Sequence, residues 1–442
     1  MNIPSPAPKR RGASLRAFGL VLATTLALAA CGGGVDAEPE HHDDHDEETI
    51  DTAGRLALAE NGSVTLRVHD LDTYALDASH TLDFSPSSLY ASPGGRYAVA
   101  LQRTNDQVQF VDGGVWQEDH GDHQHDYEQG SRLLSWRLTG VRPTHYNLED
   151  GVQAAFFMDG DAASTPARTG GVRLVTDASI AAGNSVASLD LPFAIHGLAA
   201  PVGNKLLSVS RASDATDASP THLELYQRSG ASYTHTRQLA TRCNGMHGGA
   251  SSGEYTAVGC REGMLLVHHD TATTVTDQIA STALRVATVA AHPALPGQFI
   301  GIATEGVAPA PVTTRFYALS GSTAAVTDFV PQGWTTGRVR RAHAYDRSGQ
   351  RFFVLDDQGT LIVSQWQGGA WQPLARIANA ITTMPTAAPF PTFTANEARN
   401  EIYLTDPAGQ QLVVLDSRTG AQLSTRALGF TPSAAVWLGI AR

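Results

Sequence analysis

One pattern of strands recurs through the body of the chain at intervals of about fifty residues. Each unit has a short strand, a glycine-containing turn, two strongly apolar strands separated by another turn, and a strand with alternating polar residues. In one unit these strands fall at 341–345, 351–355, 360–363 and 371–377. The units begin at Tyr90, His145, His196, His247, His292, His343 and Thr394, in steps of 55, 51, 51, 45, 51 and 51 residues. A period of this length in a β-rich sequence is typical of the four-stranded blades of a β-propeller.

The two ends of the chain together supply one further blade. The segment 430–433 repeats the pattern of 84–87, but only one strand follows it before the chain ends. Three strands without a blade of their own are expected at 55–60, 65–70 and 80–84. We therefore predict an all-β propeller of eight blades, with seven as the alternative. Strands from both termini would share one blade and leave no free sheet edge.

The N-terminal segment is predicted to be a targeting signal rather than part of the fold. Three basic residues at 9–11 precede a short apolar run that ends in Leu28-Ala29-Ala30-Cys31, which resembles the lipobox of bacterial lipoproteins. The resemblance implies a signal peptide at residues 1–30, cleavage before Cys31 and lipidation of that cysteine. The glycine at position 32 favours the outer membrane over the inner one. The alternative is an ordinary secretory signal followed by a chance cysteine.

Three domains follow from these patterns: the signal peptide 1–30, an acidic, His-rich disordered tether 31–53, and a propeller 54–442 with a His-rich loop 115–130. The expected location is the periplasm, with membrane contact only through the lipid. The net charge of −12 disfavours a nucleic acid partner and favours cations. We expect a monomer.

Two cysteines remain in the predicted mature chain, Cys243 and Cys260. An even number in an exported protein indicates a disulfide. The turn signal Ser251-Ser252-Gly253 lies midway between them, so a hairpin folded there would place the two cysteines directly opposite each other. The alternative is a zinc or redox pair.

The 17 histidines are concentrated in three groups. The first lies in the acidic tether (His41, His42 and His45), the second in the loop (His120, His123 and His125), and the third at the unit starts (His145, His196, His247, His292 and His343). Imidazole and carboxylate suit Zn²⁺, and the chain has no set of four cysteines and no Met-rich segment for Cu⁺.

Each group also has a simpler interpretation. The two acidic, His-rich runs are alternatively solvated low-complexity segments, and the unit-start histidines alternatively pack or form hydrogen bonds within their blades. If the first strand of each blade lines the channel, these histidines converge there, with His196, His247 and His145 the preferred ligands. If the loop joins the third and fourth strands of its blade, it emerges on the opposite face and forms a separate site.

The sequence resembles periplasmic zinc metallochaperones of the AztD type. The similar segments are 107–114, the loop 118–127, Pro143-Thr144-His145, and 243–269, and the resemblance covers roughly residues 54–442. It implies a non-enzymatic propeller that captures zinc and passes it to the solute-binding protein of a zinc ABC importer. It further implies transfer ligands at His41, His42 and His45, loop ligands at His120, His123 and His125, and body ligands at His145, His196 and His247.

Cys31 departs from this family, whose members are expected to be soluble in the periplasm. A lipid anchor implies capture at the membrane surface or transfer within reach of the tether. Two other functions remain open: an outer-membrane lipoprotein propeller that acts as a protein-assembly scaffold, and a propeller enzyme such as a metal-dependent lactonase.

Overall fold

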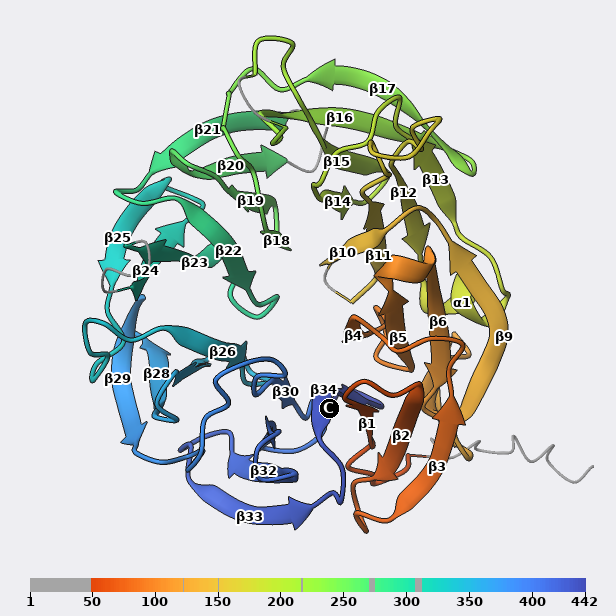
Figure 1. Cartoon of the computed structure of the whole chain (residues 1–442), viewed down its shortest axis with the longest axis vertical. Helices are drawn as coiled ribbons and strands as arrows, with labels where there is room; N and C mark the ends of the chain where they lie inside the picture. The colour runs from red at the N-terminus through yellow and green to blue at the C-terminus, as the bar shows by residue number, and fades with distance from the viewer. Residues whose placement is uncertain (1–48, 122, 150, 216–217, 270–274, 307–311) are drawn as a thin grey trace, which may run out of the picture. The chain divides into compact units, whose positions relative to one another are not determined.

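The computed structural model describes residues 49–442 except 122, 150, 216–217, 270–274 and 307–311. These residues form a ring of antiparallel sheets around a central axis, with the first strand of each sheet innermost (Figure 1). The described part holds six four-stranded sheets and one eight-stranded sheet made of two four-stranded blades, besides a small hairpin. The prediction of an eight-bladed β-propeller is therefore confirmed and the seven-bladed alternative is wrong.

The first four blades, each given from its innermost strand outward, have the following bounds. They are β34 (Pro432–Leu438), β1 (Arg55–Glu60), β2 (Thr65–Asp70) and β3 (Leu76–Thr81); β4 (Ser88–Ala91), β5 (Tyr97–Gln102), β6 (Gln107–Asp112) and β9 (Arg132–Thr139); β10 (Pro143–Glu149), β11 (Gln153–Met158), β12 (Gly171–Val175) and β13 (Ala187–Asp190); and β14 (Ala199–Val202), β15 (Lys205–Ser210), β16 (His222–Ser229) and β17 (Ser232–Gln238). A single parallel pair, Ser188 with Ser232, joins the outer strands of the third and fourth blades.

The other four blades follow the same plan. They are β18 (Gly249–Ser252), β19 (Tyr255–Gly259), β20 (Gly263–His269) and β21 (Val275–Ser281); β22 (Val286–Ala291), β23 (Gln298–Glu305), β24 (Thr313–Ser320) and β25 (Ala325–Phe329); β26 (Arg340–Tyr345), β27 (Arg351–Asp356), β28 (Leu361–Gln367) and β29 (Ala370–Ile377); and β30 (Phe393–Ala395), β31 (Glu401–Asp406), β32 (Gln411–Asp416) and β33 (Gln422–Ala427).

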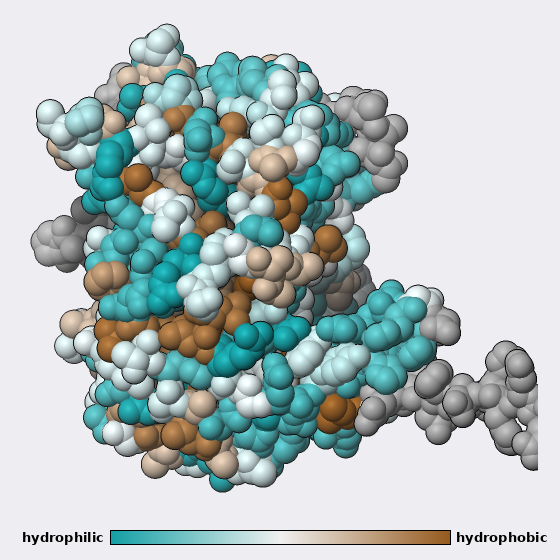
Figure 2. Space-filling model, turned by 90° about the vertical axis from the view of Figure 1, so that its right-hand side faces the viewer, coloured by the Kyte–Doolittle hydropathy of each residue, from teal (hydrophilic) through white to brown (hydrophobic). Residues whose placement is uncertain are grey.

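The burial of each strand follows its place in the blade. Second strands such as β5 and β11 are buried along their whole length, because both of their faces pack against neighbouring blades. Outermost strands such as β29 are largely exposed and carry polar residues between apolar ones. Figure 2 shows the resulting rim, on which hydrophobic residues lie in small groups among hydrophilic ones.

Both ends of the described chain meet in the first blade, as predicted. Strand β1 pairs with β34 from Arg55–Leu438 onward, and with β2 on its other side. The third predicted strand is displaced, since β3 spans Leu76–Thr81 rather than 80–84. The chain reverses earlier than expected, at Tyr74, whose φ of 60° ends the turn after β2.

The His-rich insertion folds as a hairpin between the third and fourth strands of the second blade. Its strands are β7 (Val115–Asp119) and β8 (Gln124–Glu128). Asp126 connects the hairpin to both ends of the described part of the chain. Its carboxylate accepts from the Ile50 N–H at 2.8 Å and from the guanidinium of Arg442. Glu128 pairs with Arg55 at 2.6 Å.

Two short helices complete the described residues. They are a 3₁₀ turn, η1 (Arg103–Asn105), and a five-residue helix, α1 (Asp177–Ala181), which is capped by Thr176. Within the described part of the chain, neither helix has the length and apolar character that crossing a membrane requires.

The predicted disulfide between Cys243 and Cys260 is present, with the Cα atoms 5.7 Å apart. The expected strand register is wrong. Strands β18 and β19 pair Ser252 with Tyr255, so the turn lies at Gly253 and Glu254 rather than at Ser251. Cys243 therefore lies in the segment before β18 instead of opposite Cys260 in the ladder.

Candidate metal centre

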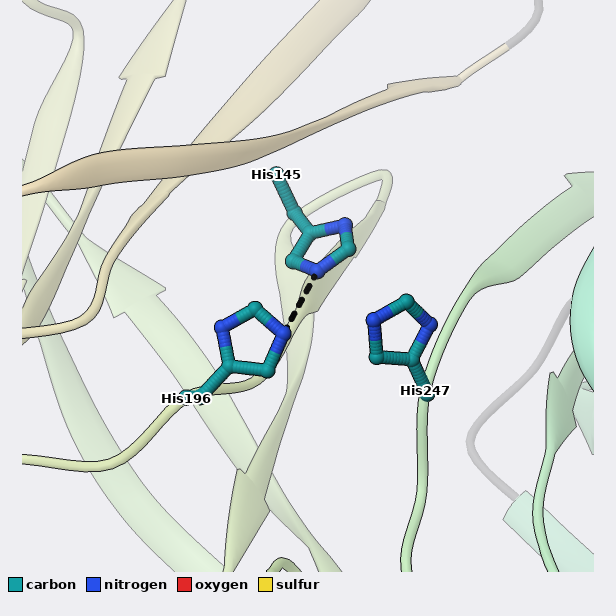
Figure 3. Close-up of side chains that lie close together, drawn as sticks. All are labelled: His145, His196 and His247. Carbon is teal, nitrogen blue, oxygen red and sulfur yellow. Dashed lines mark hydrogen bonds between the residues drawn. The ribbon is translucent and has the colours of Figure 1, made fainter. Parts of the chain in front are cut away.

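Three histidines from consecutive blades meet near the axis of the ring. His145 lies on β10, His196 three residues before β14, and His247 two residues before β18. Their ring centroids are 5.1, 5.1 and 5.2 Å apart, and each ring turns one nitrogen towards the shared gap (Figure 3). The structure thus brings together the three body ligands that the sequence predicted.

The spacing of the nitrogens suits one tetrahedral ion. Nε2 of His145 lies 3.4 Å from Nε2 of His196, and ligand nitrogens of all three residues lie within 4.8 Å of one another. Two nitrogens bound to zinc at about 2.0–2.1 Å in tetrahedral geometry are separated by about 3.3 Å. A small contraction towards the third ring would therefore place all three nitrogens around a single Zn²⁺.

Two of the three rings are held in orientation by their other nitrogen. Nδ1 of His196 lies 2.9 Å from Oδ2 of Asp159, and Nδ1 of His247 lies 2.9 Å from the carbonyl oxygen of Ala287. A neutral ring that donates from Nδ1 presents the lone pair of Nε2 to the gap. Arg103 holds Asp159 in turn at 2.7 Å.

The protonation state of His145 also favours metal binding. Its burial, together with repulsion from His196 and His247, lowers the pKa of His145 to about 4. The ring is therefore neutral near pH 7, as a ligand must be. The side chain of His196 is 46% exposed, so the cluster is open to solvent and to an incoming ion.

The loop histidines form a second cluster at the tip of the β7–β8 hairpin. The centroids of His120, His123 and His125 are 5.0–5.4 Å apart, and the His120 N–H donates to the His123 carbonyl across the turn at 3.0 Å. Nε2 of His120 also lies 3.2 Å from the Tyr127 hydroxyl. The turn of the hairpin brings the three rings together, although their nitrogens do not all lie as close to one another as those of the other cluster.

The two clusters lie at opposite ends of strand β5. At its start, Arg96 stacks on Trp116 of the hairpin, with the guanidinium 3.6 Å from the ring centroid. Directly after its end, Arg103 contacts Asp159, the partner of His196. Six residues of extended chain span roughly 20 Å, so the loop and the three-histidine cluster are separate sites, a point that the sequence alone left open.

A cavity of about 370 Å³ lies among the innermost strands of the ring. Tyr90, Tyr146, Asn147 and Val289 are among the residues that line it, and the described residues of its lining include no carboxylate or imidazole.

The unit-start histidines of the next two blades do not join the cluster. His292 follows β22 instead of preceding it, and therefore lies at the other end of its strand from His145. His343 lies inside β26 beside Arg340, which is 3.0 Å away, and burial lowers its pKa to about 3. The interpretation that all five unit-start positions point alike is wrong, because the innermost strands begin at different offsets from the repeated residue.

Some predicted positions lie outside the described residues. They are the tether histidines His41, His42 and His45 and the lipidation site Cys31. Asp159 and Arg103, in contrast, were not predicted from the sequence. The only local signal at Asp159 is an Asp-Gly pair after an apolar strand, and its partner His196 is 37 positions away.

These features define the class of the protein: an eight-bladed β-propeller with a cluster of three histidines suited to a divalent metal. No family model matches the sequence. In sequence, the chain is similar to the zinc chaperone AztD of Citrobacter koseri, with 27% identity over 221 residues. The match covers 49% of this chain and 48% of that protein, so the chain spans about half the length of the curated relative.

Solved structures show the same likeness in fold. Apo AztD from Citrobacter koseri has a TM-score of 0.69 at 21% identity, covering 86% of this chain and 96% of that one, and a second crystal structure of that protein gives 0.69 at 20%. The dihydro-haem d1 dehydrogenase NirN is more distant, with a TM-score of 0.55 at 11% identity over 91% of this chain and 79% of that one. The predicted resemblance to AztD is confirmed in both sequence and fold, and that relative is named a chaperone rather than an enzyme.

Proposed function

We propose that this protein is a zinc metallochaperone, which captures Zn²⁺ and transfers it to the solute-binding protein of a zinc ABC importer. The observation that carries the proposal is the convergence of His145, His196 and His247 on one gap of tetrahedral dimensions. The likeness to the zinc chaperone AztD supports zinc over other ions that accept imidazole.

Three protein ligands leave one coordination position for an outside group. A solvent-exposed His196 at the edge of the cluster is consistent with a donor from an acceptor protein entering there. A cargo site needs such access, whereas a structural zinc site is closed by four protein ligands.

The hairpin supports a second step in the proposed function. His120 and His123 lie at its turn and His125 on β8, all at least partly exposed, so this cluster is suited to rapid exchange. The resemblance to AztD-type metallochaperones adds His41, His42 and His45 as transfer ligands in this proposal.

The proposed location is the periplasm, with Cys31 lipidated and anchored preferably in the outer membrane. Under this proposal the protein acts as a monomer and reaches its acceptor within the length of the tether. The competing function, a scaffold for protein assembly, requires no metal.

Elemental analysis of mature protein purified without chelator tests the proposal. We expect at least one zinc per chain, and a loss of about one equivalent in the variant His145→Ala/His196→Ala/His247→Ala. His292→Ala is the matched control, because that histidine has the same repeat position but lies outside the cluster. A zinc content that the triple variant leaves unchanged would contradict the proposal.

Transfer is tested by mixing zinc-loaded protein with the apo solute-binding protein of the importer in excess chelator. Direct transfer predicts that the acceptor gains zinc faster than the chelator removes it from the donor alone. A rate equal to simple dissociation, or a metal-free protein that co-purifies with membrane-assembly proteins, would favour the scaffold.

A further inference from the structure

We infer that the Cys243–Cys260 disulfide is a positioning element of the three-histidine cluster and sets its metal affinity by holding His247 in place. The inference rests on the zinc-binding function proposed above. It concerns how the site is assembled, and it gives the oxidation state of the chain a direct effect on metal loading.

His247 differs from His145 in how the backbone supports it. His145 belongs to strand β10 and is fixed by the ladder between β10 and β11. His247 lies in the segment 243–248, which precedes β18 and contains none of the described strands. Its position therefore depends on the contacts that this segment makes with other parts of the blade.

Two contacts of His247 itself lie next to Cys260. The His247 N–H donates to the carbonyl of Gly259, which is the neighbour of Cys260 in the chain. The His247 ring contacts the carbonyl of Ala287, and the preceding residue, Val286, donates its N–H to the carbonyl of Cys260 at 3.0 Å. Cys260 is thus the point at which the two supports of His247 meet.

The disulfide ties this point to the start of the segment that carries His247. Both cysteines are completely buried, and Cys243 is four residues before His247. Other bonds span the same boundary, from Arg261 N–H to the Asn244 carbonyl and from Asn244 N–H to Glu262. Water can replace the partners in these hydrogen bonds, whereas the disulfide is a covalent cross-link between segments 243–248 and 259–263 in addition to the backbone that connects them.

The consequence is that the cluster is complete at all times only in the oxidised chain. Without the disulfide, the segment 243–248 has more freedom to separate from 259–263, and Nε2 of His247 leaves the gap for part of the time. His145 and His196 keep their own supports and would form a weaker, two-ligand site. Metal affinity should therefore fall, while the fold of the other blades stays intact.

Cobalt binding provides the test, since Co²⁺ reports tetrahedral nitrogen coordination through its visible absorption. The mature protein is first prepared with His120, His123 and His125 changed to Ala, so that the hairpin does not contribute. In this background, Cys243→Ala/Cys260→Ala is expected to weaken Co²⁺ binding at the body cluster about tenfold or more, the range found when groups that orient ligands are lost. The tetrahedral absorption should weaken as well.

Two controls separate positioning from general loss of stability. The first is Leu404→Ala, a core substitution in the eighth blade, which should lower the melting temperature without changing Co²⁺ affinity. The second keeps both cysteines: the same background protein is reduced with a phosphine, checked by mass spectrometry and circular dichroism, and titrated before and after reoxidation. We expect reduction to weaken binding and reoxidation to restore it.

Co²⁺ affinity that is unchanged in both the double variant and the reduced protein would overturn the inference alone. An equal loss of affinity in Leu404→Ala would also overturn it, since general destabilisation would then be the cause. Failure of the oxidised background protein to bind Co²⁺ would overturn the proposed function itself, and the inference with it.

Discussion

His196 and Asp159 are joined by a 2.9 Å hydrogen bond between Nδ1 and Oδ2, although they belong to different blades. Asp159 follows β11 of the third blade, His196 precedes β14 of the fourth, and Arg103, which holds Asp159, follows β5 of the second. The orientation of one metal-facing ring therefore depends on loops from three successive blades. A carboxylate in this position fixes the tautomer of the ring and raises its basicity.

Asp159→Asn should weaken zinc binding at the body cluster about 10- to 100-fold, because an amide orients the His196 ring less strongly than a carboxylate does. Competition with a chromophoric chelator measures the change. The matched control is Asp161→Asn, two residues away, whose carboxylate pairs with Arg142 and Arg168 instead of a histidine. Equal affinities for the two variants would show that Asp159 does not orient the ring.

The two histidine clusters should lose zinc independently. Replacing His120, His123 and His125 by Ala should remove the zinc held by the hairpin and leave the affinity of the body cluster within about twofold, because the residues that connect to each cluster lie at opposite ends of β5, a strand roughly 20 Å long. Isothermal titration of the two triple variants and their combination measures this. If the hairpin variant also weakens the body cluster strongly, the two sites are coupled and the view of separate sites is wrong.

The metal-free protein should lose stability as the pH falls below about 6.5. Burial is the main cause that lowers the pKa of His145 and of His269 to about 4 and that of His343 to about 3, whereas their unfolded values are about 6.5. Between the folded and the unfolded pKa values, the unfolded chain binds more protons than the folded chain. The stabilisation of the fold by these neutral histidines is therefore complete above pH 6.5 and is lost as the pH approaches their folded-state pKa values.

Thermal unfolding of the apoprotein between pH 7 and pH 4 tests this dependence. At about 1.4 kcal/mol per pKa unit, the effect of His145 is at most on the order of 3 kcal/mol. His343→Phe should give a shallower dependence, because it removes one of the titrating groups. A melting temperature that does not change over this range would argue against three histidines that are buried in their neutral form.

Asp126→Ala should loosen the hairpin from the ring. The side chain of Asp126 is buried and accepts from Ile50, Gln117 and Arg442, so its removal leaves the Arg442 guanidinium without this partner. We expect a loss of about 2–4 kcal/mol in the free energy of unfolding and faster hydrogen exchange in β7 and β8. Gln124→Ala, an exposed change on the same hairpin, should have little effect; equal exchange in both variants would contradict the role of Asp126.

Trp437→Ala should be strongly destabilising because Trp437 closes the ring. Its ring is buried and donates from Nε1 to the Ala53 carbonyl at 2.9 Å. Loss of this side chain should cost about 3–5 kcal/mol, and Trp437→Phe about 1 kcal/mol for the hydrogen bond alone. Urea unfolding measures both, with the exposed Leu423→Ala as the control; similar stabilities for all three variants would exclude a closing role.

Much of the fold was predictable because it depends on local signals. The alternation of apolar strands and glycine turns repeats in every blade, so the class of fold and the number of blades follow from the period. The shared first blade was also predictable, since the three N-terminal strands and the single strand at 432–438 each lack a complete blade of their own. The start of β3 was misplaced, because the turn before it contains Tyr74 rather than a glycine.

The site was only partly predictable. His145, His196 and His247 were identified by their repeat position, but His292 and His343 share that position and lie elsewhere. The difference arises because the strands begin at different points: β22 starts six residues before His292, whereas β18 starts two residues after His247. Asp159 and the Ala287 carbonyl belong to other blades, and nothing in the local sequence indicates what they contact.

The pairing of β1 with β34 also determines when a newly synthesised chain can finish folding. Arg55 and Leu438 are partners across nearly the whole sequence, so synthesis presents the first of these strands long before the second exists. Until then the backbone N–H and C=O groups along one edge of β1 stay unpaired and can pair with strands of other chains. Contacts between residues so far apart in the sequence also form slowly during folding. A chain cut short before residue 432 would never cover that edge, and aggregation rather than partial activity is the expected fate of truncated copies.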